Sequence, residues 1–231
     1  MIHLLNNLNN MNICIISTPR SGSTYLVKLL QQSPEISHFI DEPFNPDNIT
    51  VDYTLGCEEH LHKIQAMSMH DNVLIKDNEN TRIPSLYPHN NKLQNVIKEY
   101  EKLLKEKFYL IKLTRDNLFE QTLSSCIAPL NNIWVRNFDT EFPTTVNINV
   151  DTFKQLYFEF KLRNELLNSY AGCQKIIRYE DITGDSRTDW NLISGISSPD
   201  NYAIINNLRN FEKHLVVKNY VELQQLYEQF K

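Results

Sequence analysis

The stretch Asn12-Ile-Cys-Ile-Ile-Ser-Thr-Pro-Arg-Ser-Gly-Ser-Thr24 decides the fold of this chain. Its first part, residues 12–17, is short, apolar and rich in β-branched side chains, which is typical of a strand buried on both faces of a parallel sheet. A turn with one glycine follows. Residues 23–32 then have leucines spaced as on one face of a helix, and the helix is expected to end before Pro34. The order of strand, turn and helix predicts one unit of an α/β domain.

The turn between this strand and this helix has the composition of an anion-binding loop. A helix N-terminus presents unpaired N–H groups and the positive end of the helix dipole. Gly22 lets the backbone approach an anion, and the chain has five glycines where average usage gives roughly sixteen. Ser21, Ser23 and Thr24 add hydroxyl donors, and Arg20 adds a permanently charged guanidinium. The loop alone also fits a plain strand-to-helix connection with a serine-rich cap.

The loop differs from that of an ordinary ATP- or GTP-hydrolysing enzyme. The Walker A pattern has a lysine directly after its second glycine and another glycine five residues before it. Here Ser23 follows Gly22, and Ser17 stands where the earlier glycine is needed. A nucleotide kinase or hydrolase of that kind is therefore disfavoured.

A second basic position follows another apolar segment. Residues 107–113 predict a strand that runs directly into Arg115. The next residues predict a helix over about 117–127, whose polar face carries Ser124 and Ser125. Open α/β sheets bind ligands at the carboxyl ends of their strands, so Arg115 and a serine of this helix are expected to bind a second anion. The alternative for Arg115 is a surface arginine beside an acidic neighbour.

These two segments resemble the donor-binding motifs of sulfotransferases. Thr18-Pro-Arg-Ser-Gly-Ser-Thr-Tyr-Leu26 resembles the loop that binds the 5′-phosphosulfate of 3′-phosphoadenosine-5′-phosphosulfate. It is closest to the Pro-Arg-Ser-Gly-Ser/Thr-Thr form of bacterial carbohydrate and protein-tyrosine sulfotransferases. Arg115 and Ser124 match the arginine and serine that bind the donor's 3′-phosphate, with Ser125 as the alternative serine. Gln121 also matches the bacterial pattern.

The resemblance extends toward the end of the chain. Arg178-Tyr-Glu-Asp181 resembles a segment whose role in the family is largely structural, and Lys213 with residues 216–220 resembles a tail that can contribute to the 3′-phosphate site. The donor-binding residues that the resemblance implies are Arg20, Ser21, Gly22, Ser23, Thr24, Arg115, Ser124 and Lys213.

The resemblance also implies the groups that perform the transfer. Glu42 stands at the spacing where bacterial and protein-tyrosine sulfotransferases carry a catalytic glutamate, and it would take the proton of the acceptor hydroxyl. Arg20 would stabilise charge on the leaving phosphate. His38 is the rival base, because cytosolic sulfotransferases use histidine, and Asp41 is a further substitute. Lys76 matches a lysine near the transferred sulfate, or it is an ordinary lysine at a strand end.

Alternation of strands and helices along the whole chain predicts an α/β fold, a three-layer sandwich with a central, mainly parallel sheet. The resemblance implies the P-loop-NTPase-like version of this fold that sulfotransferases have. The predicted strands are residues 12–17, 72–76, 107–113 and 174–179. Residues 35–50 are predicted to be a loop because of Pro43 and Pro46, and the length predicts a single domain over residues 1–231.

Charge and cysteine usage limit the classes of function. A net charge of −5 argues against a general nucleic-acid binder. The cysteines form no Cys-x-x-Cys pair, which favours reduced thiols in a cytoplasmic protein. No apolar run approaches the roughly 20 residues that span a bilayer, and the N-terminus lacks the pattern of a signal peptide. We expect a protein without a transmembrane segment, either monomer or homodimer.

The expected function is transfer of a sulfuryl group to a small hydroxylated acceptor, such as a carbohydrate or a glycolipid headgroup, with no metal ion. His60 and His62 are two residues apart on a predicted helix and do not share a face, so they do not predict a metal site. Trp134 would stack on an adenine or a sugar ring, or it packs a loop. A catalytically inactive nucleotide-binding module of the same fold and a divergent nucleotide kinase are the alternative functions.

Overall fold

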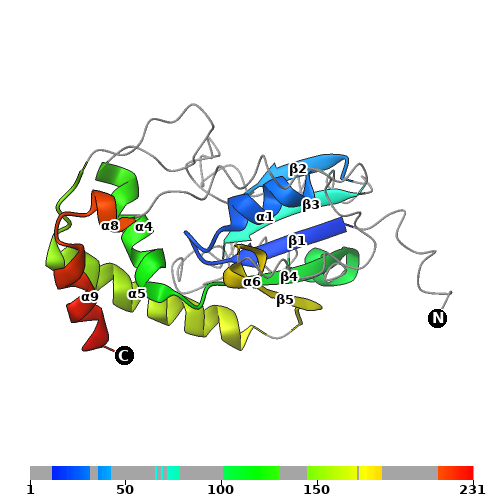
Figure 1. Cartoon of the computed structure of the whole chain (residues 1–231). Coiled ribbons are helices and arrows are strands. Elements are labelled where there is room, and N and C mark those ends of the chain that lie inside the picture. Colours follow the sequence, from blue (N-terminus) through cyan, green and yellow to red (C-terminus); the bar gives the residue numbers. More distant parts are fainter. Residues whose placement is uncertain are drawn as a thin grey trace, which may run out of the picture.

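The computed structural model describes residues 12–31, 36–42, 66, 69, 72–78, 101–130, 145–170, 172–183 and 213–230. The elements within them are β1 (Asn12–Ser17), α1 (Ser23–Leu30), β2 (His38–Asp41), β3 (Val73–Asn78), β4 (Phe108–Thr114), α4 (Leu118–Leu130), α5 (Val150–Ser169), β5 (Lys175–Arg178), α6 (Tyr179–Thr183), α8 (Lys213–Val216) and α9 (Tyr220–Glu228). The strands form one five-stranded sheet in the order β2-β3-β1-β4-β5 (Figure 1). All neighbouring strands are parallel, which confirms the predicted α/β fold.

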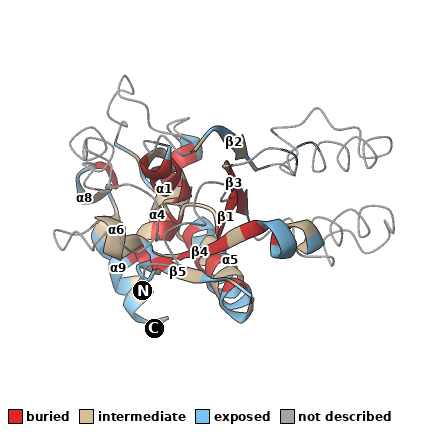
Figure 2. Cartoon of the chain, turned by 90° about the vertical axis from the view of Figure 1, so that its right-hand side faces the viewer, coloured by how far each residue is buried: buried red, intermediate tan, exposed pale blue. Residues whose placement is uncertain are grey.

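The sheet carries helices on both faces, because its central strands are apolar on both sides. Alternate side chains of a strand point to opposite faces. Ile13 and Ile15 of β1 pack with Leu26 of α1 on one face. Cys14 of the same strand packs with Leu167 of α5 on the other face. The result is the expected three-layer arrangement, and Figure 2 shows the buried residues concentrated on the central strands and α1.

The order of the strands predicts a ligand-binding crevice between β1 and β4. After β1 the chain passes through α1 to β2 on one side of the sheet's centre, and after β4 it passes through α4 and α5 to β5 on the other side. Where the connections of two neighbouring parallel strands diverge in this way, the carboxyl ends of the strands leave a crevice that binds ligands. The residues that directly follow β1 and β4 are therefore the first candidates for a ligand site.

An aromatic cluster joins the C-terminal helices to α4 and α5. The ring of Phe119 in α4 lies 5.7 Å from that of Phe153 in α5, measured between centroids. The same ring lies 5.3 Å from Tyr220 and 5.3 Å from Tyr227, both of α9. Figure 1 shows α8 and α9 beside α4, at the end of the molecule toward which the strands run. The cluster thereby brings α8 close to the crevice.

The prediction of a loop over residues 35–50 is wrong for four residues, since His38–Asp41 form β2. These residues lack a strong strand pattern and are largely exposed at the edge of the sheet. They are a strand because each pairs with a residue of β3, from His38 opposite Val73 to Asp41 opposite Lys76. The pairing partner lies more than thirty residues further along the chain, so the local sequence does not reveal it.

Some predictions fall outside the described residues. Trp134, His60 and His62 are among them. None of the helices that the structure describes has both the length and the apolar character that crossing a membrane requires.

Candidate functional site

The predicted site residues come from six parts of the described chain. The loop after β1 carries Arg20, Ser21 and Gly22, α1 begins with Ser23 and Thr24, Arg115 follows β4, Ser124 lies in α4, Lys213 begins α8, and Glu42 follows β2. Arg20 and Arg115 thus stand directly after the two strands that flank the crevice.

The loop after β1 has an unusual backbone. Arg20 has a φ of 60° and Gly22 a φ of 91°. A residue other than glycine in the left-handed region costs on the order of 1 kcal/mol or more, so contacts must hold Arg20 in place. One such contact comes from Arg115, whose Nη1 donates to the backbone oxygen of Arg20 at 3.0 Å. The two arginines after β1 and β4 are therefore directly linked.

Gly22 lies against the ring of Tyr179, the first residue of α6. A Cβ atom at position 22 would lie 2.2 Å from Cδ2 of Tyr179, well inside van der Waals contact. Position 22 therefore requires glycine for two reasons, the backbone conformation and the ring.

The same ring of Tyr179 supports Arg115. The guanidinium carbon of Arg115 lies 4.5 Å from the ring centroid, which is the geometry of a cation–π contact. The carboxylate of Glu180 accepts hydrogen bonds from the N–H groups of Asp116 and Asn117, at 3.2 and 3.0 Å. The segment after β5 therefore holds the turn after β4, in agreement with the structural role expected for residues 178–181.

A buried network ties the loop to α4 and α5. Nε2 of Gln121 donates to Oγ1 of Thr18 at 2.8 Å and to the backbone oxygen of Pro19 at 2.7 Å. Asn164 of α5 donates to Oε1 of Gln121 at 3.2 Å, and the hydroxyl of Thr18 donates to Oδ1 of Asn164 at 2.9 Å. Sequence reasoning missed Asn164, because it lies in an amphipathic helix far from the loop in the chain and no local signal marks it.

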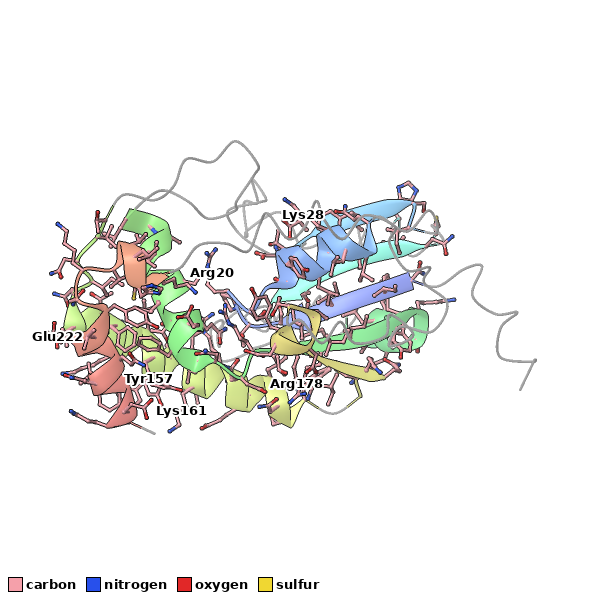
Figure 3. The ribbon with its side chains drawn as sticks, viewed as in Figure 1. Arg20, Lys28, Tyr157, Lys161, Arg178 and Glu222 are labelled. Carbon is pink, nitrogen blue, oxygen red and sulfur yellow. The ribbon has the colours of Figure 1, made fainter. Side chains whose placement is uncertain are left out.

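Arg20 contacts the predicted serine of α4. Its Nε and Nη2 donate to Oγ of Ser124 at 3.1 and 2.9 Å. Figure 3 shows Arg20 extending from the loop toward α4. Ser124, the hydroxyl expected to act with Arg115, thus contacts Arg20, so this hydrogen bond joins the two predicted anion-binding motifs.

Lys213 of α8 joins this pair of arginines. Its ammonium forms an ion pair with Glu120 of α4, one helical turn before Ser124. Burial lowers the pKa of Lys213 to about 8; the Glu120 carboxylate opposes the shift, and the charges of Arg115 and Arg20 add to it. Burial and the charge of Arg115 also lower the pKa of Arg20. Three cations from distant parts of the chain are therefore close enough to repel one another.

Two polar atoms of the site are buried without a hydrogen-bond partner among the described residues, Oγ of Ser21 and Nε of Arg115. An unsatisfied buried polar group costs about 1–3 kcal/mol. An anion bound beside the three cations would reduce the repulsion among them.

Glu42 lies at the same edge of the sheet, at its outer strand. Nζ of Lys76 lies 2.7 Å from Oδ1 of Asp41 and 2.9 Å from Oε1 of Glu42. Burial by itself lowers the pKa of Lys76, but the hydrogen bonds and charges of the two carboxylates outweigh it and raise that pKa. With β3 between β2 and β1, Glu42 is two strand spacings, about 10 Å, from β1 across the sheet.

His38, the rival base, begins β2, whereas Glu42 follows its end. Strands rise about 3.3 Å per residue, which puts His38 about 13 Å from Glu42 toward the amino edge of the sheet. The carboxyl edge therefore carries Glu42 and not His38. Within the part of the chain that the structure describes, no three His, Cys, Asp or Glu side chains are grouped so as to hold a metal ion.

Comparisons with known proteins add little to this geometry. No family model matches the sequence, and no curated protein matches it in sequence. Among solved structures, the crystal structure of mouse sulfotransferase SULT7A1 complexed with PAP is similar, with a TM-score of 0.45 and 12% identity. The alignment covers 97% of this chain and 68% of that chain.

Proposed function

We propose that this chain is a sulfotransferase that moves a sulfuryl group from 3′-phosphoadenosine-5′-phosphosulfate to a hydroxyl of a small acceptor. The observation that carries the proposal is the convergence of Arg20, Arg115 and Lys213 at the crevice between β1 and β4. Cations held together against their repulsion favour a ligand with several negative charges. The donor has two separate phosphate groups, and both motifs resemble those of enzymes that bind it.

The two ends of the donor are assigned to the two motifs. The loop at 20–24 is proposed to bind the 5′-phosphosulfate, with the N–H groups that begin α1 and the hydroxyls of the loop as donors. Arg115, Ser124 and Lys213 are proposed to bind the 3′-phosphate. The contact between Arg20 and Ser124 supports this assignment, because it puts the two half-sites next to each other.

The proposed chemistry is a direct transfer. The acceptor oxygen bonds to sulfur while the bond between sulfur and the bridging phosphate oxygen breaks, and the acceptor's proton passes to the carboxylate of Glu42. The guanidinium of Arg20 stabilises the charge that develops on the leaving phosphate. Lys76 holds the carboxylate of Glu42 in place. The acceptor is proposed to be a carbohydrate or a glycolipid headgroup, and the cytoplasm is the proposed location.

A nucleotide-binding module without catalysis is the second candidate. It is favoured by the ion pair between Glu42 and Lys76, since protonation of Glu42 would break that pair. The module predicts binding of adenosine 3′,5′-bisphosphate without transfer to any acceptor. A nucleotide kinase instead predicts selective binding of ATP with Mg²⁺.

Thermal shift and a transfer assay separate these functions. For the sulfotransferase, the bisphosphate raises the melting temperature more than ATP with Mg²⁺ does, because a ligand selective for the folded state stabilises it. Labelled donor then transfers sulfate to at least one member of a panel of sugars and alcohols. Stronger stabilisation by ATP with Mg²⁺ would contradict the proposal, and binding without transfer over the whole panel would favour the module.

Two variants test the assigned roles. Arg115→Ala should lose bisphosphate binding. Glu42→Gln should keep binding and lose turnover by about a hundredfold or more, which is the usual contribution of a general base. Glu165→Gln is the control: it removes a charge from an exposed position of α5 and should leave bisphosphate binding and turnover unchanged. Full turnover in Glu42→Gln would exclude Glu42 as the base.

A further inference from the structure

Glu120 is a carboxylate among the cations of the site, and the proposed transfer assigns it no task. It forms the ion pair with Lys213, whose side chain is only 11% exposed. Tyr220 of α9 also donates a hydrogen bond to Glu120, and burial together with this carboxylate raises the pKa of Tyr220. One side chain of α4 therefore holds both C-terminal helices beside the crevice.

The position of Glu120 on α4 brings Lys213 to the two arginines. Glu120 and Ser124 are four residues apart in a helix, which puts their Cβ atoms about 5–6 Å apart on one face. Ser124 accepts hydrogen bonds from Arg20, and Arg20 accepts one from Arg115 through its backbone oxygen. The lysine that pairs with Glu120 thus lies near enough to Arg115 and Arg20 for their charges to lower its pKa.

Lys213 is the cation of this group that can lose its charge. Arginine stays protonated in proteins, whereas a buried lysine near other cations readily releases its proton. The charged and titratable groups around Lys213 are Arg20, Arg115, Glu120, Tyr220 and His214. Among these groups, Glu120 is the one that favours the ammonium form.

We propose that Glu120 is a positioning residue that keeps Lys213 charged and beside the two arginines, so that the site offers a third cation to a phosphate monoester at neutral pH. This inference rests on the proposed function in so far as the monoester is the 3′-phosphate of the nucleotide. Glu120 does not itself bind the anion. It acts through Lys213. At low pH, where Lys213 is protonated even without Glu120, the negative charge of Glu120 only repels the anion slightly.

These opposing effects of Glu120 predict that the plots of phosphate affinity against pH for the wild type and for Glu120→Gln cross. With Glu120 replaced by glutamine, Lys213 loses its proton at lower pH, so the variant should bind the phosphate less tightly near pH 8. At the lowest pH tested Lys213 is charged in both proteins, and the variant, which lacks a repelling carboxylate, should bind at least as tightly as the wild type. A purely structural loss would weaken binding at every pH.

Isothermal titration calorimetry on the full chain measures these profiles, with adenosine 3′,5′-bisphosphate and adenosine 5′-monophosphate as the probes between about pH 6.5 and 9, above the phosphate pKa near 6. Wild-type affinity for the bisphosphate should fall as the pH rises through about 8, the pKa of Lys213. Glu120→Gln should bind it about tenfold or more weakly at pH 8, the effect of one charge-assisted hydrogen bond. Affinity for the monophosphate, which lacks the 3′-phosphate, should have the same pH dependence in both proteins.

Two further variants keep the test decisive. Glu120→Gln/Lys213→Arg should restore binding that is independent of pH, because a guanidinium stays charged without a counter-ion. Glu222→Gln is the matched control, since Glu222 is an exposed carboxylate of α9 that lies far from Arg20 in Figure 3. An unchanged profile in Glu120→Gln, or no restoration by arginine, would overturn the inference.

The inference and the proposed function can fail separately. If the wild type binds neither nucleotide, the proposed function is wrong. The titration of Lys213, followed by NMR of lysines labelled at Cε, still judges the role of Glu120. The midpoint for Lys213 must fall in Glu120→Gln and stay unchanged in Glu222→Gln. An unchanged midpoint in Glu120→Gln would exclude the role even if the nucleotide binds. If Glu120→Gln does not fold, Lys213→Arg alone must remove the loss of bisphosphate affinity above pH 8.

Discussion

Replacing Gly22 by alanine should destabilise the protein through two separable effects. The first is the backbone, because Gly22 has a φ of 91°, where an L-residue costs roughly 1–2 kcal/mol. The second is steric, because the new Cβ would lie 2.2 Å from Cδ2 of Tyr179. Overpacking of this kind costs about 1–3 kcal/mol. Gly22→Ala should therefore lower the free energy of unfolding by about 2–5 kcal/mol.

Gly172 and Tyr179 provide the controls that separate the two effects. Gly172 also has a positive φ, 110°, but a Cβ atom there would meet nothing within 4 Å. Gly172→Ala should therefore show the backbone effect alone, about 1–2 kcal/mol. In a Tyr179→Ala background, Gly22→Ala should also fall to about that value. The coupling free energy between positions 22 and 179 is then about 1–3 kcal/mol, as expected for residues in contact.

Urea denaturation followed by circular dichroism measures all these free energies of unfolding. If Gly22→Ala is no more destabilising than Gly172→Ala, or equally destabilising with and without the ring of Tyr179, the ring is not what excludes a side chain at position 22. Because the same ring supports Arg115, Gly22→Ala should also weaken bisphosphate binding. Full affinity in a folded variant would contradict it.

Three further predictions concern charged and buried groups. Lys76→Met removes the ammonium that pairs with Asp41 and Glu42 and should lower the free energy of unfolding by about 1–3 kcal/mol; an unchanged melting temperature would contradict this. Burial lowers the pKa of Lys213 from 10.5 in the unfolded chain to about 8 in the folded chain. Between these two pH values the unfolded chain therefore binds more protons than the folded chain does. The stability of the wild type should therefore rise with pH across that window, and this rise should be absent in Lys213→Met when both are followed by denaturant titration. Burial raises the pKa of the Cys126 thiol to about 12, so iodoacetamide at pH 8 should modify the partly exposed Cys173 of the native protein and leave Cys126 unlabelled by mass spectrometry.

Local patterns in the sequence were sufficient for most of the fold. The segments that form β1, β3 and β4 are short runs of buried apolar residues, and α4 has the periodicity of a helix, so each could be assigned from its own residues. β2 could not be assigned, because it is an exposed edge strand that depends on pairing with β3. The residue Tyr179 was predicted to end a strand, but it begins α6 and turns its ring to Gly22 and Arg115.

The sequence by itself determined where the anion-binding residues stand in the chain. Arg20 and Arg115 each follow a strand directly, and in a parallel sheet all strand ends meet at one edge. Only the tertiary structure decided which side chains meet there. Ser124 contacts Arg20, and Lys213 arrives with Glu120 as its partner because aromatic rings pack α8 and α9 against α4. The spacing of apolar residues is a local property that the sequence shows directly. The charge of a buried lysine, in contrast, depends on groups that packing brings together from distant parts of the chain.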